Sequence, residues 1–247
     1  MDEIVFRPFH TVACMTRCST CNMREICLPV GLNREEMSYV DGHMVVGQRK
    51  VARGETLIHA GDRFDALFVV WTGFFKSLIT SRQGKEQVTG FQTSGELIGL
   101  GGIDTGRHEV DVVALEDSQV CVIPYAQLEA VALEVPSLQR EFHRHMSHEI
   151  ATDHEAMLQL GSMHAEERVA AFLLNLVHRL EVRGFSSSSV LLRMSREEIG
   201  SFLGLKLETV SRTLSKFQAD GLLFVRQRQI QITEPLGLQQ VLDPAAS

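Results

Sequence analysis

The sequence lacks any long hydrophobic run. Its longest strongly apolar stretch, residues 66–75, is too short to span a bilayer. The chain starts Met-Asp-Glu-Ile-Val-Phe-Arg-Pro, which has neither the basic start nor the long apolar core of a signal peptide. We therefore expect a cytoplasmic protein without membrane contact. In that compartment thiols stay reduced and structural disulfides are rare.

The sequence also lacks the local patterns that mark common enzyme sites. It contains no nucleophile–base arrangement, no P-loop and no dinucleotide-binding fingerprint. The glycines in residues 97–103 come nearest, but they do not form a G-x-G-x-x-G element between a strand and a helix, so we interpret them as turn residues. We expect that the protein is not an enzyme.

Cysteine is scarce, with five residues in 247, but four of the five lie close together. Cys14, Cys18, Cys21 and Cys27 are near neighbours, whereas Cys121 stands alone. In a reducing compartment such a run indicates metal binding or redox sensing. Four thiolates are the usual ligands of an iron–sulfur cluster. Zinc also accepts four, although structural zinc ligands usually come as two close pairs. The residues alone leave a cluster, a zinc ion and a thiol switch open.

The net charge of −7 conceals a basic C-terminal region. Residues 190–232 hold four anions and seven cations, Arg193, Arg196, Lys206, Arg212, Lys216, Arg226 and Arg228. This region carries +3, so the rest of the chain carries −10. The asymmetry is expected if only the C-terminal part meets phosphate. Chance clustering on solvated faces is the alternative.

Residues 29–124 consist of short apolar runs separated by glycines. Turn signals at this spacing predict an all-β sandwich or roll with no helices between its strands. Residues 81–85 lie between two such runs, and we expect them to form the tip of a hairpin.

A long helix is predicted after these strands. Helical periodicity begins near Pro124 and restarts at Pro136, a residue type that suits the first turn of a helix. Spacings of three and four then define a heptad-like seam, Phe142, Met146, Ile150, Asp153, Met157 and Leu160. This seam predicts a two-fold homodimer, and packing of the helix on its own roll is the alternative. Asp153 opposes association, because its two copies would repel each other in a parallel dimer.

The C-terminal region has the pattern of a winged helix-turn-helix. Ser195 and Glu198 form a capping box that opens a helix ending at Gly204, and a second helix follows over about residues 207–220. Two short helices joined by a glycine turn indicate DNA binding. Residues 222–232 alternate as two strands with a basic tip and add the wing.

Three residues near the start of the second helix are candidates for reading bases. Glu208, Ser211 and Arg212 share one face at spacings i, i+3 and i+4. Arginine can bond bidentately to guanine, glutamate can accept from the amino group of cytosine, and serine can contact either kind of base. The alternative is an ordinary surface ion pair between Glu208 and Arg212.

These features together resemble the cyclic-AMP receptor and FNR superfamily of bacterial transcription regulators, and within it the oxygen-responsive FNR branch. The resemblance runs from Cys18 to about Ile232. Its most specific parts are Cys18-x-x-Cys21-x₅-Cys27 with the distant Cys121, the stretch His164-Ala-Glu-Glu-Arg-Val-Ala-Ala-Phe and the stretch Gly204-Leu-Lys-Leu-Glu-Thr-Val-Ser-Arg212.

The resemblance implies a cofactor and partners. It implies that Cys18, Cys21, Cys27 and Cys121 hold an oxygen-labile four-iron–four-sulfur cluster, with Cys14 outside the ligand set. The loaded homodimer is then expected to bind double-stranded DNA at an inverted repeat with TTGAT-like half-sites and to contact RNA polymerase. The matching DNA-binding positions are Lys206, Glu208, Thr209, Ser211 and Arg212.

The sequence departs from the family pattern at two places and also lacks the nucleotide-binding motif of the cyclic-nucleotide branch. Lys206 stands where a capping Ser or Thr is expected, and its charge is available to a phosphate instead. The hairpin surface that would touch RNA polymerase, Gly84 and Lys85, carries a lysine. Gly95-Glu96 resembles the ribose-binding start of the cyclic-nucleotide branch, but the expected Arg-Ser/Thr-Ala does not follow it; Arg107 precedes His108-Glu109 instead. We therefore expect no cyclic nucleotide as a ligand.

We predict an α+β protein with an N-terminal β-roll of the cyclic-nucleotide-binding type, a long dimerisation helix and a C-terminal winged helix-turn-helix. The expected division is a cysteine-rich cluster-binding segment at 1–28, the roll at 29–135, the dimer helix at 136–163 and the DNA-binding domain at 164–247, with residues 186–189 as a linker. Oxygen would dismantle the cluster and end DNA binding. A zinc-stabilised or thiol-switched regulator of the same fold is the alternative.

Overall fold

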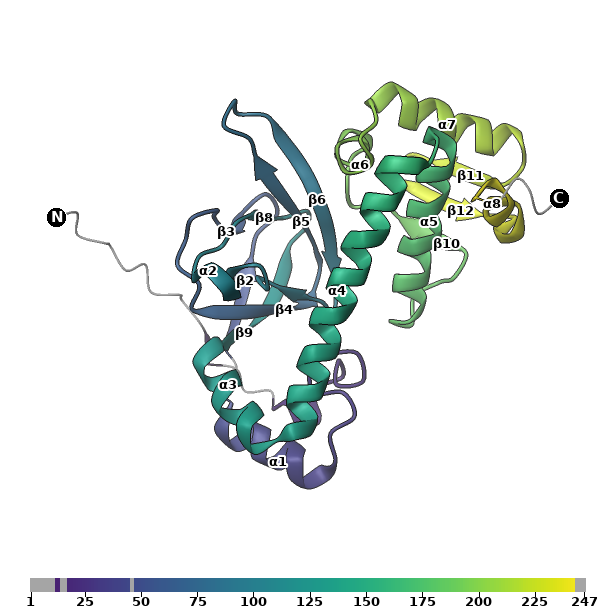
Figure 1. Cartoon of the computed structure of the whole chain (residues 1–247). Coiled ribbons are helices and arrows are strands. Elements are labelled where there is room, and N and C mark those ends of the chain that lie inside the picture. Colours follow the sequence, from purple (N-terminus) through teal and green to yellow (C-terminus); the bar gives the residue numbers. More distant parts are fainter. Residues whose placement is uncertain (1–11, 14–16, 45–46, 243–247) are drawn as a thin grey trace. The chain divides into compact units, whose positions relative to one another are not determined.

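The computed structural model describes residues 12–13, 17–44 and 47–242 (Figure 1). Its internal contacts group the chain into two units, one formed by Met1–Ile79 and Phe91–Ser147 and the other by Thr80–Gly90 and His148–Ser247. The predicted four-part division of the chain stays a prediction. In the described ranges, no helix has both the length and the apolar character needed to cross a membrane.

Two antiparallel sheets form the roll. The five-stranded sheet has the order β1-β2-β9-β4-β7 and the four-stranded sheet the order β3-β8-β5-β6. The strands are β1 (Val12–Ala13), β2 (Gly47–Val51), β3 (Thr56–Ile58), β4 (Ala66–Thr72), β5 (Phe74–Thr80), β6 (Glu86–Thr93), β7 (Leu97–Ile98), β8 (Asp111–Ala114) and β9 (Ser118–Pro124). Phe68 and Val120 of one sheet share a hydrophobic core with Phe75 and Val112 of the other. The predicted roll is therefore present.

The expectation that residues 29–124 contain no helix is wrong. The structure has a ten-residue helix α1 (Arg34–His43) and a single helical turn α2 (Gly102–Thr105). Asn33 caps α1, because its side chain accepts hydrogen bonds from the backbone N–H groups of Glu35 and Glu36. The Asn33–Glu36 capping box is thus a helix start that the glycine-based strand prediction overlooked.

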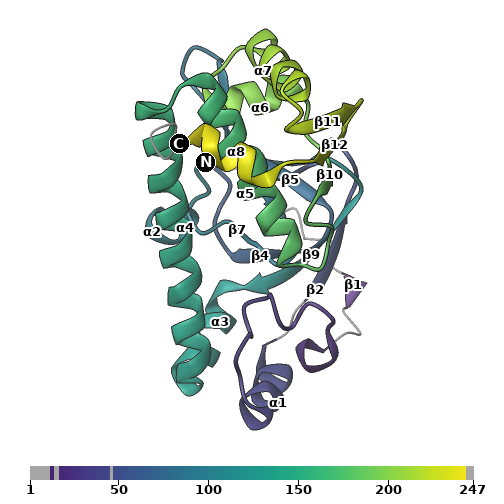
Figure 2. The same ribbon diagram turned by 90° about the vertical axis from the view of Figure 1, so that its right-hand side faces the viewer.

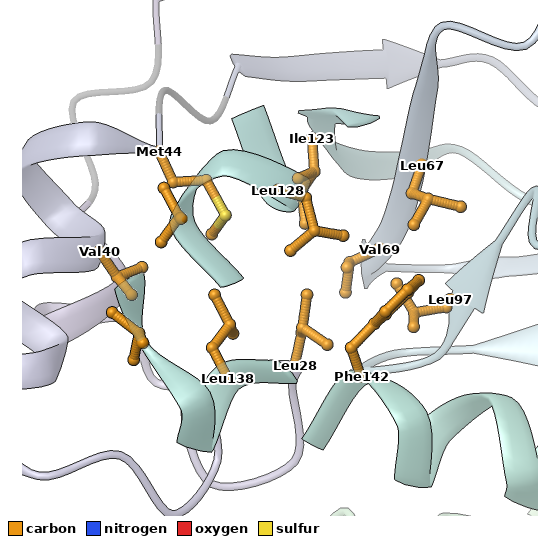
Figure 3. Packing of buried hydrophobic residues seen from close by; sticks show 12 residues of the cluster. Leu28, Val40, Met44, Leu67, Val69, Leu97, Ile123, Leu128, Leu138 and Phe142 are labelled. Atoms are coloured by element: carbon orange, nitrogen blue, oxygen red, sulfur yellow. The ribbon is translucent and has the colours of Figure 1, made fainter. Parts of the chain in front are cut away.

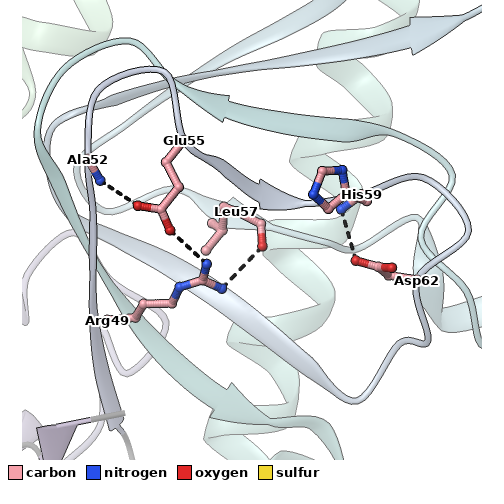
Figure 4. Close-up of polar contacts among 6 residues, drawn as sticks. All are labelled: Arg49, Ala52, Glu55, Leu57, His59 and Asp62. Carbon is pink, nitrogen blue, oxygen red and sulfur yellow. Dashed lines mark hydrogen bonds and ion pairs between the residues drawn. The ribbon is translucent and has the colours of Figure 1, made fainter. Parts of the chain in front are cut away.

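A polar network supports the turn between β2 and β3 (Figure 4). The carboxylate of Glu55 accepts from the N–H of Ala52 at 2.9 Å and from the guanidinium of Arg49 at 3.0 Å. Arg49 also donates to the carbonyl of Leu57 at 3.4 Å. The bond from Ala52 and the charge of Arg49 hold the pKa of the Glu55 carboxyl below its ordinary value. This network fixes β2, a neighbour of the strand that carries Cys121.

Helices α3 (Tyr125–Glu134) and α4 (Pro136–Ser162) follow the roll. The predicted start of the long helix at Pro136 is confirmed, and the helix has 27 residues. Its first turns pack on the roll through Leu138 and Phe142, which share a core with Val69 and Leu97 (Figure 3).

The second unit contains the predicted helix-turn-helix and wing (Figure 2). Its elements are α5 (Ala165–Glu181), β10 (Ser189–Leu191), α6 (Arg196–Leu203), α7 (Leu207–Ala219), β11 (Leu223–Arg226), β12 (Gln229–Ile232) and α8 (Pro235–Leu242). The three strands pair in the order β10-β12-β11. Strand β10 lies partly in the predicted linker and α8 was not predicted, because both depend on distant partners rather than on a strong local pattern.

Local geometry explains the sharp turn between α6 and α7. Ser195 caps α6 and Gly204 ends it at φ +63°, a left-handed conformation that glycine adopts without strain. A Cβ on Gly200 would lie 2.6 Å from the carbonyl oxygen of Leu205, so only glycine allows the turn to approach α6 this closely.

Arg168 connects this motif to the end of α4. Its guanidinium donates to the carbonyls of Leu160 at 2.8 Å, Met163 at 2.9 Å and Leu203 at 3.0 Å. The last turn of α4 and the end of α6 are therefore held by one side chain within the second unit.

Candidate metal centre and nucleic-acid interface

Four cysteines line one cavity in the first unit. Cys18, Cys21 and Cys27 come from the loop before α1, and Cys121 comes from β9. All four side chains are half-buried, and none of them is in a disulfide bond. The remaining lining residues are Met23, Arg24, Pro29, Met44, Gln48, Val69, Val70, Trp71 and Ile123. Cys14 lies outside the residues that the structure describes.

The sheet presents Cys121 to the loop. In the register of the strands, Cys121 pairs with Gln48 of β2 on one side and with Val69 of β4 on the other. All three residues line the cavity, so they form a row across the side of it that the sheet provides. The loop brings the other three cysteines to this row.

The loop has a defined backbone conformation. Residues Cys18–Thr20 form one 3-10 turn, and the N–H of Met23 donates to Sγ of Cys21 at 3.4 Å. The N–H of Ser19 donates to the carboxylate of Asp41 in α1 at 3.2 Å. Hydrogen bonds to cysteine sulfur are a feature by which proteins tune iron–sulfur clusters. The conformation of the loop is therefore stabilised by a hydrogen bond to the sulfur of Cys21 within the loop and by a hydrogen bond to Asp41 of α1.

Gly95 lies directly against the loop. It has a φ of +86°, and a Cβ built on it would lie 2.8 Å from the carbonyl oxygen of Ile26 and 3.1 Å from its side chain. Because Ile26 precedes Cys27, a side chain at position 95 would displace the backbone beside a cavity cysteine. The Gly95-Glu96 segment, which resembles a ribose-binding start, thus packs against the cysteine loop at Ile26.

The thiols influence one another electrostatically. Burial raises the pKa of the Cys27 thiol far above its ordinary value, and the neighbouring Cys18 and Cys121 raise it further. Metal ligation requires thiolates. In the absence of a bound cation, Cys27 therefore stays a neutral thiol.

The four thiols suit an iron–sulfur cluster by their chemistry, but their positions do not form a coordination sphere for a metal ion. No group of three or more His, Cys, Asp or Glu side chains in the described ranges is arranged to hold a metal ion. The four thiols instead border a shared cavity whose lining contains no carboxylate or imidazole. Soft sulfur ligands in apolar surroundings select iron–sulfur clusters and other soft metals over hard cations.

The cavity connects to the start of α4 through Leu28. This residue follows Cys27, is fully buried, and lies between Leu138 and Phe142 of α4 (Figure 3). A second link joins α1 to α4, because the hydroxyl of Ser137 donates to the carboxylate of Glu36 at 2.5 Å. Leu28 and Ser137 therefore connect the cysteine loop and α1 to the first turns of α4.

The predicted dimer seam divides into two parts. Phe142 is only 7% exposed and Met146 packs against the same core, so these two residues pack on the protein's own roll. Ile150, Met157 and Leu160 are 56%, 62% and 42% exposed, and Asp153 is also exposed. Periodicity located the stripe but did not say which part of it faces the roll.

Helix α7 presents the predicted reading residues. Glu208 and Arg212 are exposed, and within the described ranges no ion pair joins them. Thr209 is half-buried, and Lys206 occupies the N-cap position without a side-chain capping bond. The hydroxyl of Ser211 accepts a hydrogen bond from Arg196, a contact that the sequence pattern did not reveal.

Two further predicted positions lie elsewhere. Gly84, at φ +77°, and the exposed Lys85 lie in the hairpin between β5 and β6, where Ser81 N–H donates to the Lys85 carbonyl at 2.9 Å. The predicted hairpin is therefore present. Arg107 donates to the carbonyl of Gly61 at 2.7 Å, which engages part of its guanidinium within the roll.

Comparison with known proteins agrees with this architecture. Family models match a cyclic nucleotide-binding domain at residues 48–134 and a Crp-like helix-turn-helix domain at residues 167–241. The chain is 42% identical over 238 residues to the transcriptional activator protein Anr of Pseudomonas protegens, covering 96% of each chain. It is 37% identical over 240 residues to the fumarate and nitrate reduction regulatory protein of Escherichia coli K12, covering 97% of this chain and 96% of that one.

A solved structure supports the same assignment. FixK2 from Bradyrhizobium japonicum matches with a TM-score of 0.73 and 30% identity over 80% of this chain and 97% of that one. The curated relatives are transcription regulators rather than enzymes. The sequence, the fold and these relatives agree that the chain belongs to the CRP/FNR superfamily of transcription regulators, with a C-terminal helix-turn-helix DNA-binding domain.

Proposed function

We propose that this protein is an oxygen-responsive transcription regulator. Cys18, Cys21, Cys27 and Cys121 would hold a four-iron–four-sulfur cluster, and the loaded protein would bind DNA as a homodimer at an inverted repeat of TTGAT-like half-sites. The observation that carries the proposal is the convergence of three loop thiols and one strand thiol on a single, largely apolar cavity. The names of the relatives, a fumarate and nitrate reduction regulator and the activator Anr, support it.

The bound cluster would supply an oxygen-labile link between the loop and the sheet. The protein's own residues pass the state of that link to α4. Ligation of Cys27 would fix the backbone next to Leu28, which packs with Leu138 and Phe142. Loss of that ligation would free the loop, and the start of α4 would then lose the packing that Leu28 provides. A shift of only a few kcal/mol between two states is enough for such a switch.

The exposed half of the α4 stripe would form the dimer. Ile150, Met157 and Leu160 expose apolar surface on a helix whose last turn is held to α6 by Arg168. Two-fold pairing of α4 would set two recognition helices about one DNA turn apart. Arg212 would then read a guanine in each half-site, Glu208 a cytosine, and Lys206 a phosphate. We place the protein in the cytoplasm, with RNA polymerase as a partner at Gly84 and Lys85.

Anaerobic purification tests the proposal directly. We expect protein with stoichiometric iron and sulfide, a brown colour, a broad visible absorbance that air bleaches, and specific binding to the TTGAT repeat that is lost with the colour. A colourless protein containing zinc would favour the zinc-stabilised alternative. A metal-free protein whose DNA binding follows thiol oxidation would favour the thiol switch. Addition of cyclic AMP is expected to leave DNA binding unchanged.

Gly95→Ala is expected to weaken retention of the cluster. The new Cβ would meet the carbonyl of Ile26 at 2.8 Å and push the loop away from Cys121. We expect air bleaching to be several-fold faster than in the unmodified protein. The measurement is the decay of visible absorbance after exposure to a fixed oxygen concentration.

Gly54→Ala is the matched control for that substitution. Gly54 has a similar φ of +80°, but nothing lies within 4 Å of a Cβ there. Both variants should lose roughly 1–2 kcal/mol of stability from left-handed backbone strain, whereas only Gly95→Ala should bleach faster. Equal rates of bleaching in the two variants would show that the contact between Gly95 and the cysteine loop does not affect retention of the cluster.

A further inference from the structure

The contact between Arg196 and Ser211 joins the two helices of the DNA-binding motif. Arg196 is the first residue of α6, and its Nη1 donates to Oγ of Ser211 in α7 at 3.2 Å. The arginine is half-buried, and within the described ranges it forms no ion pair with a carboxylate. A cation at the N-terminus of a helix is unfavourable for the helix dipole. Stabilisation of α6 therefore does not account for Arg196, which leaves its contact with Ser211 or a contact with a DNA phosphate.

The hydroxyl of Ser211 differs from that of its helical neighbour. Ser215, one turn later, donates to the backbone carbonyl of Ser211 at 3.0 Å, which is the usual arrangement for serine inside a helix. Ser211 makes no such bond to its own preceding turn in the described structure, and its oxygen accepts from Arg196 instead. The O–H of Ser211 is therefore not used within the helix.

This arrangement decides which base groups Ser211 can meet. A hydroxyl has one donor and two acceptor positions, and the charged N–H of Arg196 occupies one acceptor position. A charge-assisted bond to the oxygen also polarises the O–H and strengthens it as a donor. Acceptors in the major groove are O4 of thymine, O6 of guanine and N7 of both purines. The amino groups of cytosine and adenine are donors and become the poorer partners.

We propose that Arg196 is a specificity-determining positioning residue, which holds Ser211 as a hydrogen-bond donor toward a base acceptor, namely thymine O4, guanine O6 or a purine N7. This inference rests on the proposed reading of bases by α7. It assigns Arg196 a role through Ser211 rather than through a base of its own.

The test measures binding of anaerobically loaded protein to TTGAT-repeat duplexes in which each base pair is changed singly. Arg196→Ala is expected to reduce discrimination at one base pair of each half-site by about tenfold, the scale of one good base contact. Ser211→Ala should lose the same discrimination, and the double variant should lose no more than either single variant. Arg196→Lys, which can still donate to Ser211, should restore part of it.

Two controls separate this role from simpler ones. Ser215→Ala should keep full discrimination, because its hydroxyl is satisfied within the helix. Arg228→Ala, in the wing turn, should weaken binding to all duplexes alike and reduce its salt dependence. A uniform loss for Arg196→Ala that adds to the loss for Ser211→Ala would mean that Arg196 only contacts phosphate, and the inference would be wrong. Failure of the unmodified protein to prefer any duplex would instead overturn the proposed reading of this repeat.

Discussion

Cys121→Ser is expected to give a colourless protein whose DNA binding is about 100-fold weaker and no longer depends on air. Cys121 is the one predicted ligand that the roll contributes, and the other three come from a single loop. Without it, ligation cannot connect the loop to β9, and the support of Leu28 for α4 is lost. If the competent dimer falls to about 1% of the protein, apparent affinity falls by the same factor. Visible absorbance, iron content and anaerobic binding to the TTGAT repeat measure the effect.

Cys14→Ser is the control for loss of a thiol. The sequence predicts that Cys14 is not a ligand, so this variant should stay brown and bind DNA with unmodified affinity. Thermal unfolding of the metal-free proteins should be similar for the two variants, since serine differs from cysteine by one atom. An air-sensitive, brown Cys121→Ser protein would remove β9 from the site and refute the coupling proposed above.

Asp153→Ala is expected to form a dimer in air, without any cluster. The side chain is exposed in the same stripe as Ile150 and Met157, and two copies would approach each other in a parallel dimer. Removal of like charges that face each other should tighten the dimer by about tenfold, allowing for screening by solvent. Analytical ultracentrifugation of metal-free protein over a range of concentrations measures the change, and DNA binding in air should appear with it.

Glu155→Ala is the matched control on the same helix. Glu155 is exposed like Asp153, but two residues along a helix it points to a different side. It should leave the metal-free protein monomeric. If both variants stay monomeric, the Asp153 repulsion is not what keeps the metal-free protein apart. If both dimerise equally, general surface charge matters and the seam does not.

The helix-turn-helix was predictable because the signals that start and end its first helix lie within a few residues of each helix end. The Ser195–Glu198 capping box and the left-handed Gly204 act over a few residues, so the sequence alone predicts α6 from Arg196 to Leu203. The same reasoning was available for α1, where Asn33 and Glu36 form an equivalent box, but the surrounding glycines favoured a strand prediction. Strand β10 lacked any such signal, since its three residues are held by β12.

By itself, the sequence determined the spacing of the cysteines, the caps of the DNA-binding helices and the stripe on α4, because each depends on neighbours along the chain. The tertiary structure decided which surfaces meet. It placed Cys121 opposite the loop, turned Phe142 toward the roll, brought Gly95 against Ile26 and joined Arg196 to Ser211. Those contacts link residues that are not neighbours in the sequence. Their geometry follows from sheet register and core packing, which sequence periodicity and residue spacing do not predict.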